Sequence, residues 1–291
     1  MIAITGATGH LGRLVVEGLL QKVPANQIIA AVRTPVKAKD LEAKGVQVRE
    51  ADYTRPETLA SAFAGVTKVL LISGSELGRR VTQHKAVIDA AKAAGVRFLA
   101  YTSLLHVSSS TLLLAEEHLA TEQYLQASGI PYAILRNGWY IENQTAGIGP
   151  ALQQGAFIGA SKEGRFAAAT RADYAAAAVA VLTGEGHENQ AYELAGDGAY
   201  TRADLAAEVS RQVGRTIAYH DLPEAEYEKI LVTFLPPELA RVLADAEAKA
   251  AAGALDDQSH TLSCLIGRRT TSLGDAVAAA LKASQAVAPV L

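Results

Sequence analysis

Met1-Ile-Ala-Ile-Thr-Gly-Ala-Thr-Gly-His-Leu-Gly12 is the stretch on which the fold of this chain depends. A short apolar run leads into three glycines, and an apolar helical pattern follows, which indicates a strand, a tight turn and a helix. Glycines in this setting allow the turn, let the backbone approach a pyrophosphate and bring the helix close to the strand. The helix N-terminus would hold the phosphates with its unpaired N–H groups. The stretch predicts a dinucleotide site formed by Gly6, Ala7, Thr8, Gly9, His10, Leu11 and Gly12.

The glycine spacing is G-x-x-G-x-x-G, tighter at its first gap than the commoner G-x-G-x-x-G, so an ordinary glycine turn is the alternative. The rest of the chain decides between the two. Strand-like apolar runs alternate with helical patterns, at residues 2–4, 27–32, 46–50, 68–72, 97–102 and 132–136. This alternation predicts an α/β fold of the Rossmann type, a doubly wound parallel sheet that binds ligands at the carboxyl ends of its strands.

The pattern changes past residue 143, where strands become short and helical stretches dominate. We expect residues 1–143 to form the dinucleotide-binding domain. Residues 144–291 should form a smaller, mostly helical C-terminal lobe that binds the substrate, with some of its segments returning to the first domain. Within the lobe, Thr201-Arg-Ala-Asp204 resembles a capping box and predicts the start of a helix.

Composition and charge exclude several classes of partner. Of the 291 residues, 49% are hydrophobic and 20% are charged, and the net charge is −3, which favours a globular protein with no nucleic-acid partner. No apolar run is long enough to cross a bilayer, and the strand at the start leaves no room for a signal peptide, so the cytoplasm is the expected location. A homodimer is the expectation from general frequencies alone.

Cysteine and histidine give two further expectations. The single cysteine, Cys264, lies in an apolar helical pattern and is predicted to be a buried structural thiol. The histidines show no metal-ligand spacing with cysteine or acidic residues, so we expect no metal site.

The end of the second predicted strand indicates which dinucleotide binds. NAD-preferring folds place an acidic residue there for the ribose 2′-hydroxyl, but this chain has Val32-Arg-Thr-Pro35. An arginine at this point can clamp a 2′-phosphate, so Arg33 favours NADPH (or NADP+) as the cofactor. For Lys37, phosphate contact and a solvated helix charge are equally weighted.

Small polar residues end the later strands at the same predicted edge. We expect them to approach the cofactor, although serine and glycine also occur in such loops for turn reasons alone. These further cofactor-binding candidates are Ser73, Gly74, Ser75, Thr102, Asn137, Gly138, Trp139 and Tyr140.

Several motifs together resemble the NmrA-type atypical short-chain dehydrogenases/reductases. They are Thr5 to Gly12, Val32 to Pro35, Ala51-Asp-Tyr53, Leu70-Leu-Ile-Ser73, Tyr101-Thr-Ser103 and Leu135-Arg-Asn-Gly-Trp-Tyr-Ile-Glu-Asn143, and the likeness runs along nearly the whole chain. Among these enzymes the chain is most similar to the bacterial NADPH:quinone oxidoreductases, with the triphenylmethane reductases as relatives. The resemblance implies a Rossmann domain with a small lobe, bound NADPH and quinone reduction. It also implies that residues 137–140 pass beside the nicotinamide and help form the acceptor pocket.

One departure from the wider superfamily bears on mechanism. Classical members carry Tyr-x-x-x-Lys on the helix after the fifth strand, where this chain has His118-Leu-Ala-Thr-Glu122. Because acidic residues surround it, His118 is expected on a solvated helix face. Tyr140 is then the best-placed proton donor, although an apolar wall is an equally weighted role, and Asn137 is the other catalytic candidate. Trp139, Tyr140 and Phe157 are candidates to stack on a planar acceptor.

The missing acid favours an electron-poor, planar acceptor such as a quinone, because hydride addition to a quinone gives a stabilised aromatic anion rather than a basic alkoxide. The leading hypothesis is NADPH-dependent reduction of quinones by direct hydride transfer. The alternatives are a reductase of cationic triphenylmethane-type dyes and a non-catalytic regulator that senses NADP(H).

Overall fold

The computed structural model describes residues 1–287, with side chains to residue 284, and divides them into two compact units. Unit 1 comprises residues 1–108, 115–137 and 171–194. Unit 2 comprises residues 109–114, 138–170 and the chain from residue 195 onward. The prediction that one domain ends at residue 143 stays a prediction.

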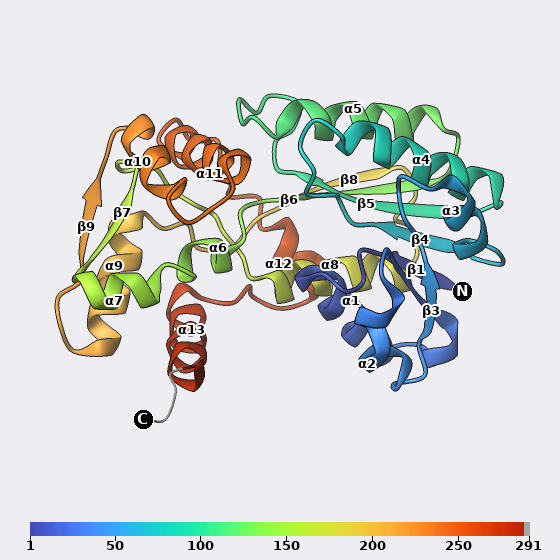
Figure 1. The fold of residues 1–291 in the computed structure, drawn as a ribbon, viewed down its shortest axis with the longest axis horizontal. Helices are drawn as coiled ribbons and strands as arrows, with labels where there is room; N and C mark the ends of the chain where they lie inside the picture. The colour runs from blue at the N-terminus through green and yellow to red at the C-terminus, as the bar shows by residue number, and fades with distance from the viewer. Residues whose placement is uncertain (288–291) are drawn as a thin grey trace. The chain divides into compact units, whose positions relative to one another are not determined.

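A parallel sheet forms the centre of unit 1 (Figure 1). Its strand order is β3-β2-β1-β4-β5-β6-β8 in the described part of the chain, and every neighbouring pair is parallel. The fold prediction is therefore confirmed. The strands are β1 (Ile2–Thr5), β2 (Ile28–Val32), β3 (Gln47–Glu50), β4 (Lys68–Leu71), β5 (Phe98–Leu104), β6 (Tyr132–Asn137) and β8 (Gln190–Leu194).

Helices cover both faces of this sheet (Figure 1). On one face, α1 (His10–Leu20) packs against α8 (Arg171–Thr183). On the other face, α4 packs against α3 on one side and against α5 on the other, with bounds α3 (Pro56–Ala62), α4 (Arg80–Ala93) and α5 (Ala115–Ala127). The short segments near the β3 edge are η1 (Ala25–Gln27), η2 (Pro35–Ala38) and α2 (Lys39–Glu42). Because the sheet is covered twice, its central strands read as continuous apolar runs.

The glycine turn joins β1 to α1 through direct contact of the backbone with itself. A Cβ at position 12 would lie 2.3 Å from the Gly6 carbonyl oxygen and 2.7 Å from the Ala7 Cα. Gly6 has a φ of +59°, which glycine adopts without the penalty that a Cβ imposes. The third glycine of the motif therefore brings α1 against the turn, as the sequence predicts.

Unit 2 contains a second, smaller sheet in which β7 (Ala156–Gly159) and β9 (Ala218–Asp221) run parallel. The predicted capping box is present at the start of α9 (Arg202–Val213). Thr201 Oγ1 accepts a hydrogen bond from the Asp204 N–H, and the Asp204 carboxylate accepts one from the Thr201 N–H. Its helices are α6 (Ile141–Thr145), α7 (Ile148–Gln154), α9 (Arg202–Val213), α10 (Glu224–Leu231), α11 (Pro237–Ala250), α12 (Thr261–Ile266) and α13 (Leu273–Val287).

The prediction of a solvated face for His118 is wrong. The residues of α5 that are buried follow the helical repeat and include both His118 and Glu122. His118 Nδ1 lies 2.7 Å from the Tyr101 hydroxyl, and Glu122 forms an ion pair of 2.7 Å with Arg136. These partners come from β5 and β6, so the sequence of α5 alone does not show that its polar residues face inward.

A second buried histidine, His84 on α4, holds the loop that follows β4. The Gly74 N–H donates to His84 Nε2 at 2.9 Å, so this nitrogen carries no proton. His84 Nδ1 lies 3.0 Å from Thr121 Oγ1, whose own proton goes to the Glu117 carbonyl. Burial, with a smaller contribution from the charge of Arg80, lowers the pKa of His84 to about 3. The contacts therefore require a neutral imidazole.

Cys264 is exposed, so the prediction that it is buried is wrong. In α12 the side chain of Leu262 is buried, whereas Cys264, two residues later, lies on the exposed side of the helix.

In residues 1–287, no helix combines the length and apolar character that a membrane span requires. The same residues hold no group of three or more histidine, cysteine or acidic side chains arranged to bind a metal ion.

Substitution of Gly12 tests the backbone contact in the turn. We expect Gly12→Ala to lower the free energy of unfolding by about 1–3 kcal/mol, because the added Cβ meets backbone atoms that cannot rotate away. The measurement is urea unfolding followed by circular dichroism. Gly198→Ala is the control, since its Cβ would meet nothing within 4 Å, and its effect should stay within about 0.5 kcal/mol. Equal effects of the two substitutions would contradict the packing argument.

Neutral His84 predicts acid destabilisation. Its folded pKa lies near 3 and its unfolded pKa near 6.5, so its contribution to stability is complete above about pH 6.5 and is lost as pH falls toward 3. Between pH 6 and 4 we expect the unfolding free energy of the wild type to fall more steeply than that of His84→Gln, by about 1 kcal/mol per pH unit. Urea titrations at a series of pH values measure both slopes. Above pH 7.5 the slopes should agree, and identical slopes below pH 6 would refute the assignment.

Candidate nucleotide-binding site

A hollow of about 560 Å³ lies in unit 1, where the glycine turn meets the segments that follow β2, β3 and β4. We call it the edge hollow. All of these segments follow the carboxyl ends of parallel strands, where α/β sheets bind ligands. It is lined by Gly6, Thr8, Gly9, Arg33, Thr34, Lys37, Ala51, Asp52, Tyr53, Thr54, Ile72, Ser73, Gly74, Ser75, Glu76, Arg79 and Gln83.

The glycine turn forms one wall of the edge hollow. The Gly9 N–H donates to the Gly6 carbonyl at 2.9 Å, and Gly9 then serves as the N-cap of α1. The N–H groups of the first turn of a helix have no intrahelical acceptor, and the helix dipole adds partial positive charge at this end. This wall is therefore suited to an anion such as a pyrophosphate.

The loop after β4 forms another wall, and side chains of three different elements hold its backbone. The Ile72 N–H donates to Thr5 Oγ1 at 3.0 Å, the Ser73 N–H to Thr102 Oγ1 at 2.9 Å and the Gly74 N–H to His84 Nε2 at 2.9 Å. These consecutive N–H groups are thus engaged within unit 1. The loop offers the hollow its side chains and its shape, while the N–H groups at the start of α1 lie on the side of the glycine turn.

Charged side chains converge at the side of the hollow beyond β2. Arg33 Nη1 lies 3.1 Å from Glu76 Oε1, and Arg79 Nη1 lies 3.6 Å from Glu76 Oε2. Gln83 Nε2 donates to the same Oε2 at 2.9 Å. The Arg33 side chain is 71% exposed and Glu76 39%, so the ion pair is open to solvent. Lys37 also lines this side.

Residues 51–54, which follow β3, line the hollow, although none of them was among the predicted cofactor-binding residues. Asp52 accepts hydrogen bonds from the Thr54 N–H and hydroxyl, which lower the pKa of its carboxyl and keep it charged. Burial raises the pKa of Tyr53 to about 12. The usable signal was positional, because a polar segment directly after a parallel strand falls at the ligand edge.

The remaining sequence-predicted residues lie outside the lining of the edge hollow. His10 is exposed, at the start of α1. Thr102 is buried beneath the loop after β4, and Asn137 is buried at the end of β6, where its carbonyl accepts from the Leu105 N–H at 3.0 Å. Ala7, Leu11 and Gly12 are buried in the turn and helix. Gly138, Trp139 and Tyr140 belong to unit 2, where Tyr140 pairs with Ala169 and caps α6.

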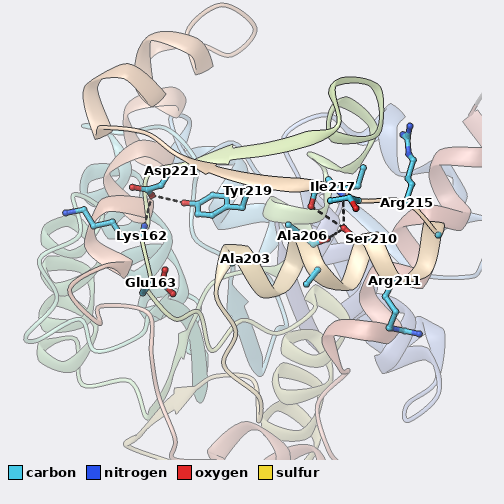
Figure 2. A pocket seen from close by; sticks show the side chains of 13 residues that line it. Lys162, Glu163, Ala203, Ala206, Ser210, Arg211, Arg215, Ile217, Tyr219 and Asp221 are labelled. Carbon is cyan, nitrogen blue, oxygen red and sulfur yellow. Dashed lines mark hydrogen bonds between the residues drawn. The ribbon is translucent and has the colours of Figure 1, made fainter.

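A larger hollow of about 930 Å³ lies in unit 2, along α9 and β9 (Figure 2). Its polar groups are engaged with one another: Asp221 accepts from the Tyr219 hydroxyl at 2.9 Å and from the Lys162 N–H at 2.7 Å. Ser210 Oγ accepts from the Ile217 N–H at 2.8 Å. Arg211 and Arg215 also line the larger hollow, but only the edge hollow combines its arginines, Arg33 and Arg79, with the glycine turn, so we assign the candidate nucleotide site there.

Known proteins resemble the chain over nearly its full length. It is 55% identical to quinone oxidoreductase 2 of Escherichia coli K12, over 95% of this chain and 97% of that protein. The crystal structure of the E. coli NADPH-dependent quinone oxidoreductase complexed with NADPH has a TM-score of 0.94 and 54% identity, covering 97% of this chain and 100% of that one. The Citrobacter triphenylmethane reductase complexed with NADP(H) has a TM-score of 0.93 and 39% identity, covering 96% and 100%.

The family match covers the part of the chain that builds the edge hollow. Residues 6–185 match the model of a family described as NAD(P)H-binding. They run from the first glycine of the turn through α8, which packs on α1. The chain therefore belongs to the NAD(P)H-binding family.

Proposed function

We propose that this protein is an NADPH-dependent quinone reductase that works by direct hydride transfer. The observation that carries the proposal is the edge hollow, in which a glycine turn at a helix N-terminus and a pair of arginines face the same space. The 55% identity with a protein named quinone oxidoreductase 2 supports the choice of acceptor. The enzyme belongs among the NAD(P)H dehydrogenases that reduce quinones.

The residues present fit a dinucleotide. Because Gly12 has no side chain, α1 packs directly against the turn. The helix N-terminus therefore lies beside Gly6 and Gly9, where a pyrophosphate would bind. Adenosine 2′-phosphate would lie beyond β2, where Arg33 and Arg79 supply charge and hydrogen-bond donors. We assign Gly6, Thr8 and Gly9 to the pyrophosphate and Arg33 to the 2′-phosphate.

Hydride transfer to a quinone requires little acid–base catalysis from the protein. Bound NADPH supplies a hydride from its nicotinamide, and the chain orients and shields the reactants. Burial holds the pKa of His118 well below its ordinary value, so the histidine at the position of the classical tyrosine is neutral and bound to Tyr101. A quinone fits such a site, because the anion formed by hydride addition is aromatic and stable enough to take its proton from water.

Residues 137–140 complete the proposed site. We assign Asn137, Gly138, Trp139 and Tyr140 to the nicotinamide end, with Asn137 and Tyr140 as the groups that contact the reacting atoms. Asn137 is the last residue of β6, at the same sheet edge as the loop after β4, which supports this placement. Trp139 and Tyr140 follow directly in the chain, and we assign their aromatic rings to contact with a planar acceptor.

Reduction of a cationic dye is the second candidate. It is favoured by the likeness to a triphenylmethane reductase at 39% identity over 96% of this chain. Hydride addition to such a cation gives a neutral product and needs no acid at all, so the same site chemistry would serve.

The test of the function is NADPH oxidation followed by absorbance, with benzoquinone, a naphthoquinone and crystal violet as acceptors. We expect turnover with the quinones well above the uncatalysed rate and above that with the dye. Gly9→Val is the inactive control. Its Cβ would meet only the Gly6 carbonyl oxygen, at 3.2 Å, so the variant should fold, but its methyl groups would occupy the space beside the turn where the pyrophosphate is proposed to bind. Faster dye than quinone reduction would favour the second candidate, and tight NADPH binding without turnover would leave the sensing role.

Cofactor preference tests Arg33. We expect the wild type to bind NADPH more tightly than NADH, and Arg33→Asp to weaken NADPH binding by about tenfold to a hundredfold, because a charge-assisted contact to phosphate is replaced by repulsion. Fluorescence titration of both reduced cofactors measures the change. Arg97→Asp is the control, because it makes the same charge change just before β5, at the amino ends of the strands and away from the ligand edge. It should leave both affinities unaltered. A wild type without preference for NADPH would contradict the assignment.

A further inference from the structure

Glu76 lies where the negative charge of a 2′-phosphate would be expected. Its two carboxylate oxygens pair with different arginines, Oε1 with Arg33 at 3.1 Å and Oε2 with Arg79 at 3.6 Å. Gln83 donates to Oε2 at 2.9 Å, so one carboxylate collects three donor side chains. All four residues line the edge hollow. The arginines assigned to the phosphate are therefore already occupied by an anion of the chain itself.

The loop that carries Glu76 is held at both ends. Before it, Gly74 donates its N–H to His84 and accepts from Arg80 Nε at 2.9 Å. After it, α4 begins at Arg80, which is itself buried and paired with Glu117 at 2.9 Å. Between these anchors Gly78 has a φ of +73°, a conformation that glycine adopts freely. The anchors place the Glu76 carboxylate opposite Arg33, which comes from the segment after β2.

We propose that Glu76 is a built-in competitor of the 2′-phosphate for Arg33 and Arg79, and thereby a specificity-determining residue. The inference rests on the proposed function, because it takes NADPH as the cofactor. A phosphate monoester carries more negative charge than a carboxylate and three acceptor oxygens, so it displaces Glu76 from the arginines. A 2′-hydroxyl carries no charge and leaves the ion pairs in place.

The strength of the competition follows from exposure. Ion pairs between solvent-exposed side chains are weak, so displacing Glu76 reduces phosphate affinity by a small factor rather than abolishing it. Removing the charge at Glu76 should therefore tighten binding of 2′-phosphorylated ligands by about fivefold. Ligands without that phosphate should show no gain, because Glu76 does not compete with their other groups.

The experiment compares 2′,5′-ADP with 5′-AMP as probes, by calorimetric titration of the wild type and Glu76→Gln. The two probes differ by the 2′-phosphate alone, and neither contains nicotinamide, so the result does not depend on hydride transfer. We expect Glu76→Gln to lower the Kd for 2′,5′-ADP about fivefold and to leave that for 5′-AMP unchanged. Titration of NADPH and NADH should show the same contrast.

Glu57→Gln is the control, since it also breaks an exposed pair with an arginine, Glu57 with Arg55 at 3.1 Å, but outside the lining of the edge hollow. It should change neither Kd. An unchanged or weaker affinity of Glu76→Gln for 2′,5′-ADP, or an equal gain for 5′-AMP, would overturn this inference alone. A wild type that binds both probes equally would overturn the NADPH assignment and this inference with it.

Discussion

The contact between the backbones of Gly6 and Gly12 is the constraint on which the cofactor unit depends. A single added carbon at position 12 would lie 2.3 Å from the Gly6 oxygen, so the turn after β1 and the start of α1 touch with no room for a side chain at position 12. The same closeness puts the α1 N-terminus at the rim of the edge hollow and lets α1 pack against α8. The packing of α1 and the shape of the proposed ligand site thus both depend on the absence of a side chain at position 12.

Close to this contact, side chains of unit 1 accept hydrogen bonds from the backbone N–H groups that line the ligand edge of the sheet. The loop after β4 gives its successive N–H groups to Thr5, Thr102 and the neutral His84, which come from β1, β5 and α4. Buried backbone donors are costly when left without acceptors, so these side chains hold the loop in one arrangement. A rigid wall then faces a rim of exposed, rearrangeable charges at Arg33 and Glu76.

The sequence was sufficient for the strands, the helices and the ligand edge, because these follow from local periodicity and from where parallel strands end. It did not reveal what depends on contacts distant along the chain. His118 is buried, and its Nδ1 lies 2.7 Å from the Tyr101 hydroxyl of β5; Glu76 pairs with Arg33, 43 positions away in the sequence. The exposure of Cys264 follows from which face α12 turns inward, which a short apolar pattern does not specify.

The place of β8 in the sheet also determines when the sheet can be completed during synthesis. The chain leaves unit 1 after residue 137 and returns at residue 171, and β8 pairs with β6 only when residues 190–194 have been made. At roughly 5–20 residues per second, β6 spends several seconds as an open edge while α6, α7 and α8 are made. An unpaired strand edge can pair with another chain, so during this interval the nascent protein exposes a site for aggregation that β8 later covers.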